Sequence, residues 1–174
     1  NNAAGFEVDP LSIGVAYSTD GTNYTKYSGN PIMRSNNVAA DCVTLYTWFT
    51  KKVGPTNYYG YFNAKHNTGA QERIHRAIAT NPLGPWTYVG EMYHHTNASV
   101  TSDFTVADLP GGGYMAAYWI NTNGSFQSAS AYSPDLITWT PAGDLFDSAS
   151  VVGTRLGFDD GLFATYCVSV PGSP

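Results

Sequence analysis

An internal repeat is the feature of this sequence that most constrains its fold. Three segments share one pattern: a short alternating strand leads into a turn, an aromatic residue precedes a threonine, and a second strand follows. The segments are residues 12–33, 74–95 and 127–148. Alternation of apolar and polar residues is typical of half-buried strands, and no stretch carries a convincing helical period. The repeat therefore predicts an all-β protein with almost no helix.

Two further sets of strand-like segments complete the repeated unit. The first set is rich in aromatic residues, aligns without gaps and comprises residues 56–65, 112–121 and 160–169. The second set precedes it and comprises residues 42–49, 103–109 and 151–158. Each unit therefore holds four short strands every ~50–60 residues, which is the size of a β-propeller blade.

The order of the strands predicts a single propeller-type domain over residues 1–174, with about three four-stranded antiparallel blades. The units are residues 12–33 together with 151–169, residues 41–95, and residues 102–148. In this arrangement the N- and C-terminal strands share the closing blade and hide both sheet edges. Because an ordinary closed propeller has four or more blades, three alternatives stay open: an unusual three-bladed ring, an oligomer of half-rings, or a fragment of a larger propeller.

The composition narrows the class of partner and the compartment. Charged residues make up 12% of the chain, the net charge is −5, and the eight Lys and Arg residues are scattered. Nucleic-acid binding is disfavoured because it needs a basic patch, and membrane insertion is disfavoured because no run of 18 apolar residues occurs. The Ser-, Thr-, Asn- and Tyr-rich polarity is typical of extracellular β proteins, and the opening Asn1-Asn2-Ala3-Ala4 indicates a processed or trimmed terminus. We therefore expect a secreted protein.

Cysteines and glycosylation motifs also bear on whether the protein is secreted. In an oxidising compartment Cys42 and Cys167 could form a disulfide; the alternative is two buried free thiols. Three N-glycosylation motifs begin at Asn23, Asn97 and Asn123. They are weak evidence, because a chain so rich in Asn, Ser and Thr contains about two by chance.

Several turns of the repeat resemble a known family. Residues 13–33 read IGVAYSTDGTNYTKYSGNPIM, residues 73–87 read RIHRAIATNPLGPWT, and residues 130–140 read SAYSPDLITWT. These patterns resemble the blade turns of glycoside hydrolase family 43 and 32 propellers. The resemblance implies a furanosidase-type propeller, shortened here and keeping the catalytic pattern only in part.

The same resemblance implies where a site would lie. Enzymes of these families use carboxylates on the innermost strands, which point into the central funnel. Asp41 sits where the family places its second-blade Asp, and Asp103 occupies the equivalent place one blade on, where the enzymes usually carry the acid Glu. The alternative for both is a structural Asp that accepts backbone N–H bonds in a turn. The first-blade Asp has no match other than Asp9, and no Glu of the chain stands in the acid position.

Aromatic residues supply candidate sugar-binding faces, because the apolar face of a sugar packs well on a ring. The candidates are Tyr46, Trp48, Tyr118 and Trp119, and the alternative is plain core packing. Trp86 and Trp139 recur at the same repeat position, which predicts packing between blades. Arg73 and Arg76 could bind a carboxylated sugar, although a solvated hairpin is the simpler interpretation.

No sequence motif indicates a cofactor or a metal site. Glu91, His94 and His95 are close in sequence, but adjacent residues of a strand point to opposite faces, and no second cluster supports a metal ion.

Two main hypotheses for function follow. The protein is either a non-catalytic glycan-binding propeller derived from a glycosidase-like ancestor, or a glycoside hydrolase acting on arabinose-, xylose- or fructose-containing glycans. The short blades and the missing acid Glu favour the first. A structural module of an extracellular or viral assembly is the third alternative. The expected partner is an oligo- or polysaccharide, and a homo-oligomer could complete a larger ring.

Overall fold

The computed structural model describes residues 10–66, 71–144, 151–158 and 162–168, with the last two ranges described as backbone only. The described residues are all-β, as predicted, and their one helical element is a short 3-10 turn, Ser35–Asn37.

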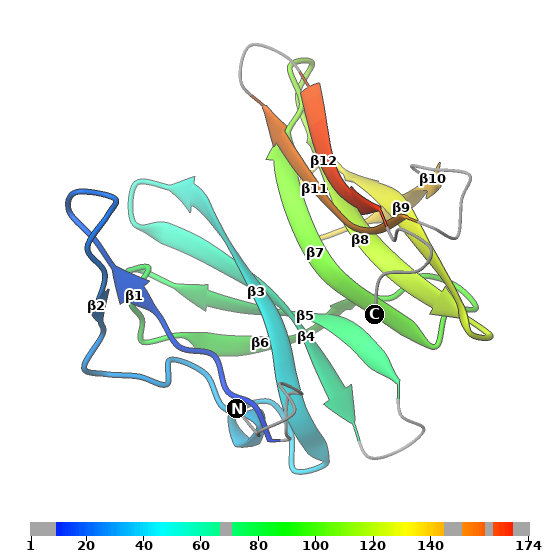
Figure 1. Cartoon of the computed structure of the whole chain (residues 1–174). Coiled ribbons are helices and arrows are strands. Elements are labelled where there is room, and N and C mark those ends of the chain that lie inside the picture. The colour runs from blue at the N-terminus through cyan, green and yellow to red at the C-terminus, as the bar shows by residue number, and fades with distance from the viewer. Residues whose placement is uncertain (1–9, 67–70, 145–150, 159–161, 169–174) are drawn as a thin grey trace.

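Two antiparallel meanders of four strands form the body of the molecule (Figure 1). The first meander contains β3 (Cys42–Gly54), β4 (Asn57–His66), β5 (Glu72–Ala79) and β6 (Thr87–Tyr93). The second contains β7 (Val100–Asp108), β8 (Tyr114–Thr122), β9 (Ser125–Ser133) and β10 (Thr140–Asp144). A single parallel bridge between Glu72 and Val100 connects the two meanders, which diverge from that point.

Two short strand pairs flank the meanders. The pair at the N-terminal end is β1 (Ala16–Tyr17) with β2 (Thr25–Lys26), and the pair at the C-terminal end is β11 (Val151–Phe158) with β12 (Leu162–Val168). The residues next to β1 and β2 pack on the first meander through Ile13 and Met33, whereas β11 contacts β7, β8 and β9.

The predicted closing blade is therefore not formed by the described strands. The N-terminal pair and the C-terminal pair are separate two-stranded sheets, because each packs against a different meander. The sheets stay open, and the described strands do not close a ring.

The core has two parts, one on each side of the first meander. The larger cluster fills the space between the meanders and includes Tyr61, Phe104, Tyr118 and Trp139. The smaller cluster lies between the first meander and the N-terminal segment. Successive side chains of β4 point to opposite faces of the sheet, so Tyr61 packs in the larger cluster and Phe62 packs in the smaller one.

The two recurring tryptophans pack as the repeat predicted. Trp86 is 9% exposed in the smaller cluster, and Trp139 is 8% exposed in the larger one. Each therefore fills the space between neighbouring layers, which is the role expected from its recurrence.

The repeated Ser-x-Asp turn has a specific hydrogen-bonding role. Asp20 Oδ1 accepts the backbone N–H groups of Thr22 and Asn23, and Asp135 Oδ1 accepts those of Ile137 and Thr138. These bonds hold the pKa of both carboxyls below the usual range. The sequence similarity of the turns therefore reflects turn chemistry.

The predicted disulfide between Cys42 and Cys167 is not formed. Cys42 is a buried free thiol whose Sγ lies 3.7 Å from the carbonyl oxygen of Thr44, and burial raises its pKa. The physical reason is again the packing: β3, which begins at Cys42, belongs to the first meander, whereas β12 pairs with β11, which contacts the second meander. The side chain of Cys167 lies outside the described residues.

Candidate functional site

A cleft of about 520 Å³ opens near the starts of β3 and β7, the first strands of the two meanders, which we call the inner strands. Its walls come from the segment before β1, from β3 and β5 of the first meander, and from β7 and β8 of the second. The lining residues are Leu11, Ser12, Ile13, Leu45, Tyr46, Thr47, Glu72, Ser102, Asp103 and Trp119. The inner strands thus bring together residues that are far apart in the sequence.

Two residues of this cleft lie in β-bulges. The register of β3 against β4 shifts between Tyr46 and Trp48, and that of β7 against β8 shifts between Ser102 and Thr105. In the β3 bulge Thr47 has a φ of 30°, and in the β7 bulge Asp103 has a φ of 58°. Residues with a Cβ rarely adopt such positive values of φ. Bulges near sites redirect a side chain out of the regular alternation, and strained backbone of this kind concentrates at functional sites.

Each bulged residue is hydrogen-bonded to the neighbouring strand. The Thr47 hydroxyl donates to Asn63 Oδ1 at 2.5 Å, and Trp119 Nε1 donates to Asp103 Oδ2 at 2.9 Å. Asn63 and Trp119 occupy the same position when residues 56–65 are aligned with 112–121. The two meanders therefore build the same contact twice with different side chains.

Glu72 is the second carboxylate of the cleft. Its Oε2 accepts a hydrogen bond of 2.8 Å from Nδ2 of the fully buried Asn63, and its backbone N–H donates to the carbonyl of Ser99 at 3.2 Å. Sequence reasoning passed over Glu72, and no local motif marks it. Only the bridge between the starts of β5 and β7 places this side chain in the cleft.

The structure separates the two predicted catalytic aspartates. Asp103 lines the cleft, whereas Asp41 precedes β3, is exposed, and lies 3.2 Å from His66 Nδ1 through its Oδ1. The predicted equivalence of these two residues is wrong, because strand pairing places Thr47 at the position of Asp103.

Of the four predicted aromatic candidates, Tyr46 and Trp119 line the cleft and are half-buried. Tyr118 is 0% exposed, and its hydroxyl contacts Tyr93 at 2.7 Å and His95 Nδ1 at 3.0 Å. Because it points into the core, Tyr118 offers no ring face to a ligand, which corrects the prediction for this residue.

Trp48 lies away from the cleft, on the other face of β3. Its ring stacks on Phe62 with centroids 5.4 Å apart and meets Trp86 edge-on at 4.9 Å. Gly60 lies directly beneath it. Trp48 is therefore a packing residue of the smaller core cluster, and the structure does not bring it to the cleft.

The other predicted sites are dispersed. His94 Nδ1 lies 3.2 Å from Glu91, whereas His95 contacts Tyr118, so the two imidazoles have different partners. Across residues 10–66 and 71–144, no three His, Cys, Asp or Glu side chains gather as metal ligands would. The asparagines of the glycosylation motifs, Asn23, Asn97 and Asn123, are exposed. Among the described elements there is no helix of the length and apolarity that a membrane crossing requires.

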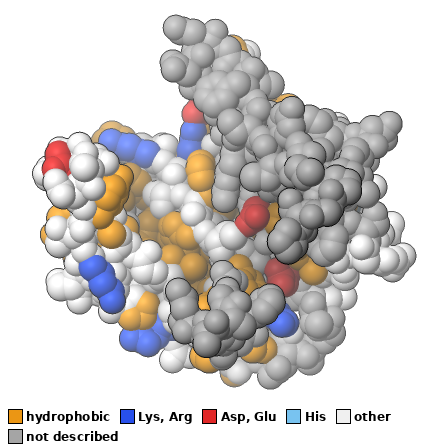
Figure 2. Space-filling view, viewed as in Figure 1, with side chains coloured by type: hydrophobic (Ala, Val, Ile, Leu, Met, Phe, Trp, Pro, Cys, Tyr) orange, Lys and Arg blue, Asp and Glu red, His pale blue; other side chains and the backbone are white. Residues whose placement is uncertain are grey.

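On the face shown in Figure 2, the Lys and Arg side chains of the described residues are scattered and form no single patch.

Comparison with known proteins gives similarity at the level of the fold. No protein-family model matches the chain, and no curated protein matches it in sequence. Among solved structures, the Bombyx mori GH32 β-fructofuranosidase superposes with a TM-score of 0.71 at 15% identity, over 91% of this chain and 36% of that one. The β-1,2-mannobiose phosphorylase from Listeria innocua gives a TM-score of 0.65 at 16% identity, over 92% and 46%. An exo-1,5-α-L-arabinanase from a bovine ruminal metagenomic library gives 0.60 at 15% identity, over 91% and 60%.

These similarities confirm the resemblance to family 32 and 43 propellers for the fold. The chain spans less than two thirds of the length of each of these structures.

Proposed function

We propose that this chain belongs to a secreted propeller-type protein that binds an oligo- or polysaccharide in the cleft at the start of β3 and β7. The observation that carries the proposal is the pairing of two half-buried aromatic side chains, Tyr46 and Trp119, with the oxygen acceptors of Asp103 and Glu72 in one cleft. Sugars present an apolar ring face and several hydroxyl donors, so this set of groups matches both.

The structural neighbours support the same proposal. Several are named as enzymes that act on glycosides, and a variant of the Bombyx mori enzyme was solved in complex with sucrose. The two meanders then correspond to two blades of a propeller, and further blades or a second copy of the chain would cover the open sides.

The test is a titration with arabino-, xylo- and fructo-oligosaccharides, followed by calorimetry. Trp119→Leu removes an aromatic face of the cleft and should weaken binding about tenfold. Tyr24→Ala is the matched control, because Tyr24 is 66% exposed and lies outside the cleft. Absence of binding to every sugar, or equal binding by both variants, would refute a glycan site in this cleft.

Hydrolysis is a second candidate, favoured by the presence of two carboxylates in the same cleft. A glycosidase needs one carboxyl group as acid and another as base or nucleophile, and Asp103 and Glu72 are the two that line it. Mass spectrometry of the sugar panel should then show cleaved products that disappear in Asp103→Asn and Glu72→Gln. Asp41→Asn should retain cleavage, and its inactivity would instead restore the Asp41–Asp103 pair expected from sequence. Binding without cleavage leaves the glycan-binding function.

A further inference from the structure

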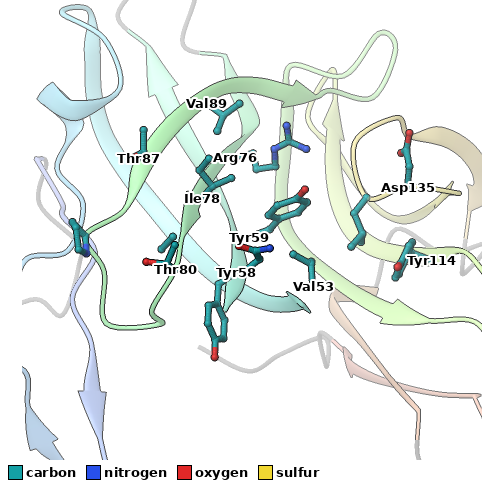
Figure 3. A pocket seen from close by; sticks show the side chains of 14 residues that line it. Val53, Tyr58, Tyr59, Arg76, Ile78, Thr80, Thr87, Val89, Tyr114 and Asp135 are labelled. Atoms are coloured by element: carbon teal, nitrogen blue, oxygen red, sulfur yellow. The ribbon is translucent and has the colours of Figure 1, made fainter. Parts of the chain in front are cut away.

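A second pocket, here called the outer groove, lies at the opposite end of the meanders from the cleft. It has a volume of about 750 Å³ and is formed by the ends of β3 and β5, the starts of β4, β6 and β8, and the turn after β9. Figure 3 shows Tyr59, Arg76, Ile78 and Val89 on one side of it and Tyr114 and Asp135 on the other.

One face of β5 connects the cleft to the outer groove. Along it, Glu72 lines the cleft, Ile74 is fully buried in the larger core cluster, and Arg76 and Ile78 line the groove. Alternate residues of a strand share a face, and four residues of strand span roughly 13 Å. With Ile74 and the core between them, the two pockets are separate sites.

Arg76 has hydrogen-bonding capacity that the described residues do not satisfy. Its Nε and Nη1 atoms are buried and have no partner among those residues, while its guanidinium lies 4.9 Å from the centroid of the Tyr59 ring. A guanidinium carries five N–H donors, and burying a charged group without a partner is unfavourable. Because Arg76 also lines the groove, a negatively charged group of a ligand there would offset this incompletely paired charge.

The surroundings of Arg76 suit a sugar better than a simple anion. Ile78 and Val89 are 41% and 47% exposed and, with the Tyr59 and Tyr114 rings, supply apolar surface. Across the groove, the Asp135 carboxylate could accept sugar hydroxyls beside its turn bonds. Because Asp135 lines the groove and the chain has a net charge of −5, a small group that concentrates two negative charges, such as phosphate, is disfavoured against a sugar unit that carries one carboxylate.

We propose that the outer groove binds a hexuronic acid unit of an acidic polysaccharide, with the carboxylate at Arg76 and the sugar ring against Tyr59 and Ile78. This site goes beyond the proposed function, because it uses other residues and a ligand class that the cleft, with its two carboxylates, would repel. The outer groove and the cleft share no lining residue, so substitutions can test each site separately.

The test compares trigalacturonate, its methyl ester and inorganic phosphate by calorimetry. Trigalacturonate should bind, and the neutral ester should bind at least about tenfold more weakly, because the charge-assisted bond to Arg76 is lost. Arg76→Gln should remove the preference for the acid. Arg73→Gln is the matched control on the same strand, since the Arg73 guanidinium bonds to the carbonyls of Glu72 and Ser99.

A second variant keeps the test decisive if Arg76→Gln does not fold. Ile78→Asp places a negative charge on the exposed wall of the groove and should weaken trigalacturonate binding by a similar factor. Equal affinity for the acid and the ester, or unchanged binding in Arg76→Gln or Ile78→Asp, would overturn the proposal. So would tighter binding of phosphate. Trp119→Leu, which tests the cleft, should leave trigalacturonate binding unchanged.

Discussion

Asp103 occupies in β7 the position that Thr47 occupies in β3, and each lies in a bulge with positive φ and is hydrogen-bonded to the equivalent residue of the next strand. The backbone geometry is therefore repeated while the chemistry differs: a carboxylate with an indole in one meander, a hydroxyl with an amide in the other. Both contacts line or support the cleft. A repeated scaffold with variable side chains at one position is what a site grafted on a repeat requires.

The Thr47 contact can be tested through stability. Thr47→Val keeps the shape of the side chain and removes the donor to Asn63 Oδ1, which is fully buried. Leaving a buried acceptor unpaired should lower the free energy of unfolding by about 1–3 kcal/mol, measured by urea denaturation. Thr140→Val, at an exposed strand position, is the control and should change it little. Equal effects would mean that the Thr47 bond contributes nothing specific.

Gly60 should tolerate no side chain. A Cβ at this position would lie 2.2 Å from Trp48 Cζ2, and Trp48 is held by Phe62 and Trp86. Gly60→Ala is therefore expected to destabilise the fold by about 1–3 kcal/mol through overpacking, measured by the shift of the thermal unfolding midpoint. Gly111→Ala is the matched control, since nothing lies within 4 Å of its Cβ. A neutral Gly60→Ala would show that Trp48 moves freely.

Tyr118 and Trp119 are neighbours in sequence with opposite predicted effects. Tyr118→Phe removes the hydroxyl that contacts Tyr93 and His95 and should lower the free energy of unfolding by about 1 kcal/mol while leaving oligosaccharide affinity unchanged. Trp119→Leu should instead weaken oligosaccharide binding and change the free energy of unfolding little. Parallel denaturation and calorimetry on both variants check this, and loss of affinity in Tyr118→Phe would contradict its assignment to the core.

His75 should make stability depend on pH. It is 2% exposed, and burial, followed by the nearby charges of His66 and Arg73, lowers its pKa to about 4. Between pH 6.5, near the unfolded pKa, and about 4, the unfolded chain binds a proton that the folded one does not. Stability conferred by neutral His75 is therefore present above pH 6.5 and is lost as the pH falls through this window.

The measurement is urea denaturation at several pH values. His75→Phe should flatten the dependence between pH 4 and 6.5, whereas His94→Gln, at an exposed position, should keep it. The loss of stability below pH 4 has another source. Turn hydrogen bonds lower the pKa of Asp20 and Asp135, and these bonds weaken when the carboxyls become protonated. If His75→Phe keeps the same dependence of the free energy of unfolding on pH, His75 is not the group responsible.

Much of the fold can be predicted from local chemistry. The alternating segments, the Ser-x-Asp turns and the recurring Trp86 and Trp139 depend on interactions within a few residues or on a pattern that repeats, so the sequence alone indicates strands, turns and packing positions. The pairing of the terminal strands cannot be predicted in this way. Strand order predicts that they join in one closing blade, but packing against separate meanders keeps them apart.

The sequence by itself determined that this protein is all-β and that its strands recur in similar units. It named Asp103, Tyr46 and Trp119 as site candidates, but it named Asp41, Trp48 and Tyr118 equally. Only the tertiary structure decided which side chains meet. The bulges at Thr47 and Asp103 shift the strand register, and no local motif marks where they occur. The bridge between Glu72 and Val100 brings Glu72 into the cleft. The physical reason is that strand pairing is non-local: a one-residue change in register reverses which face a side chain occupies, and that choice depends on the packing of the whole sheet.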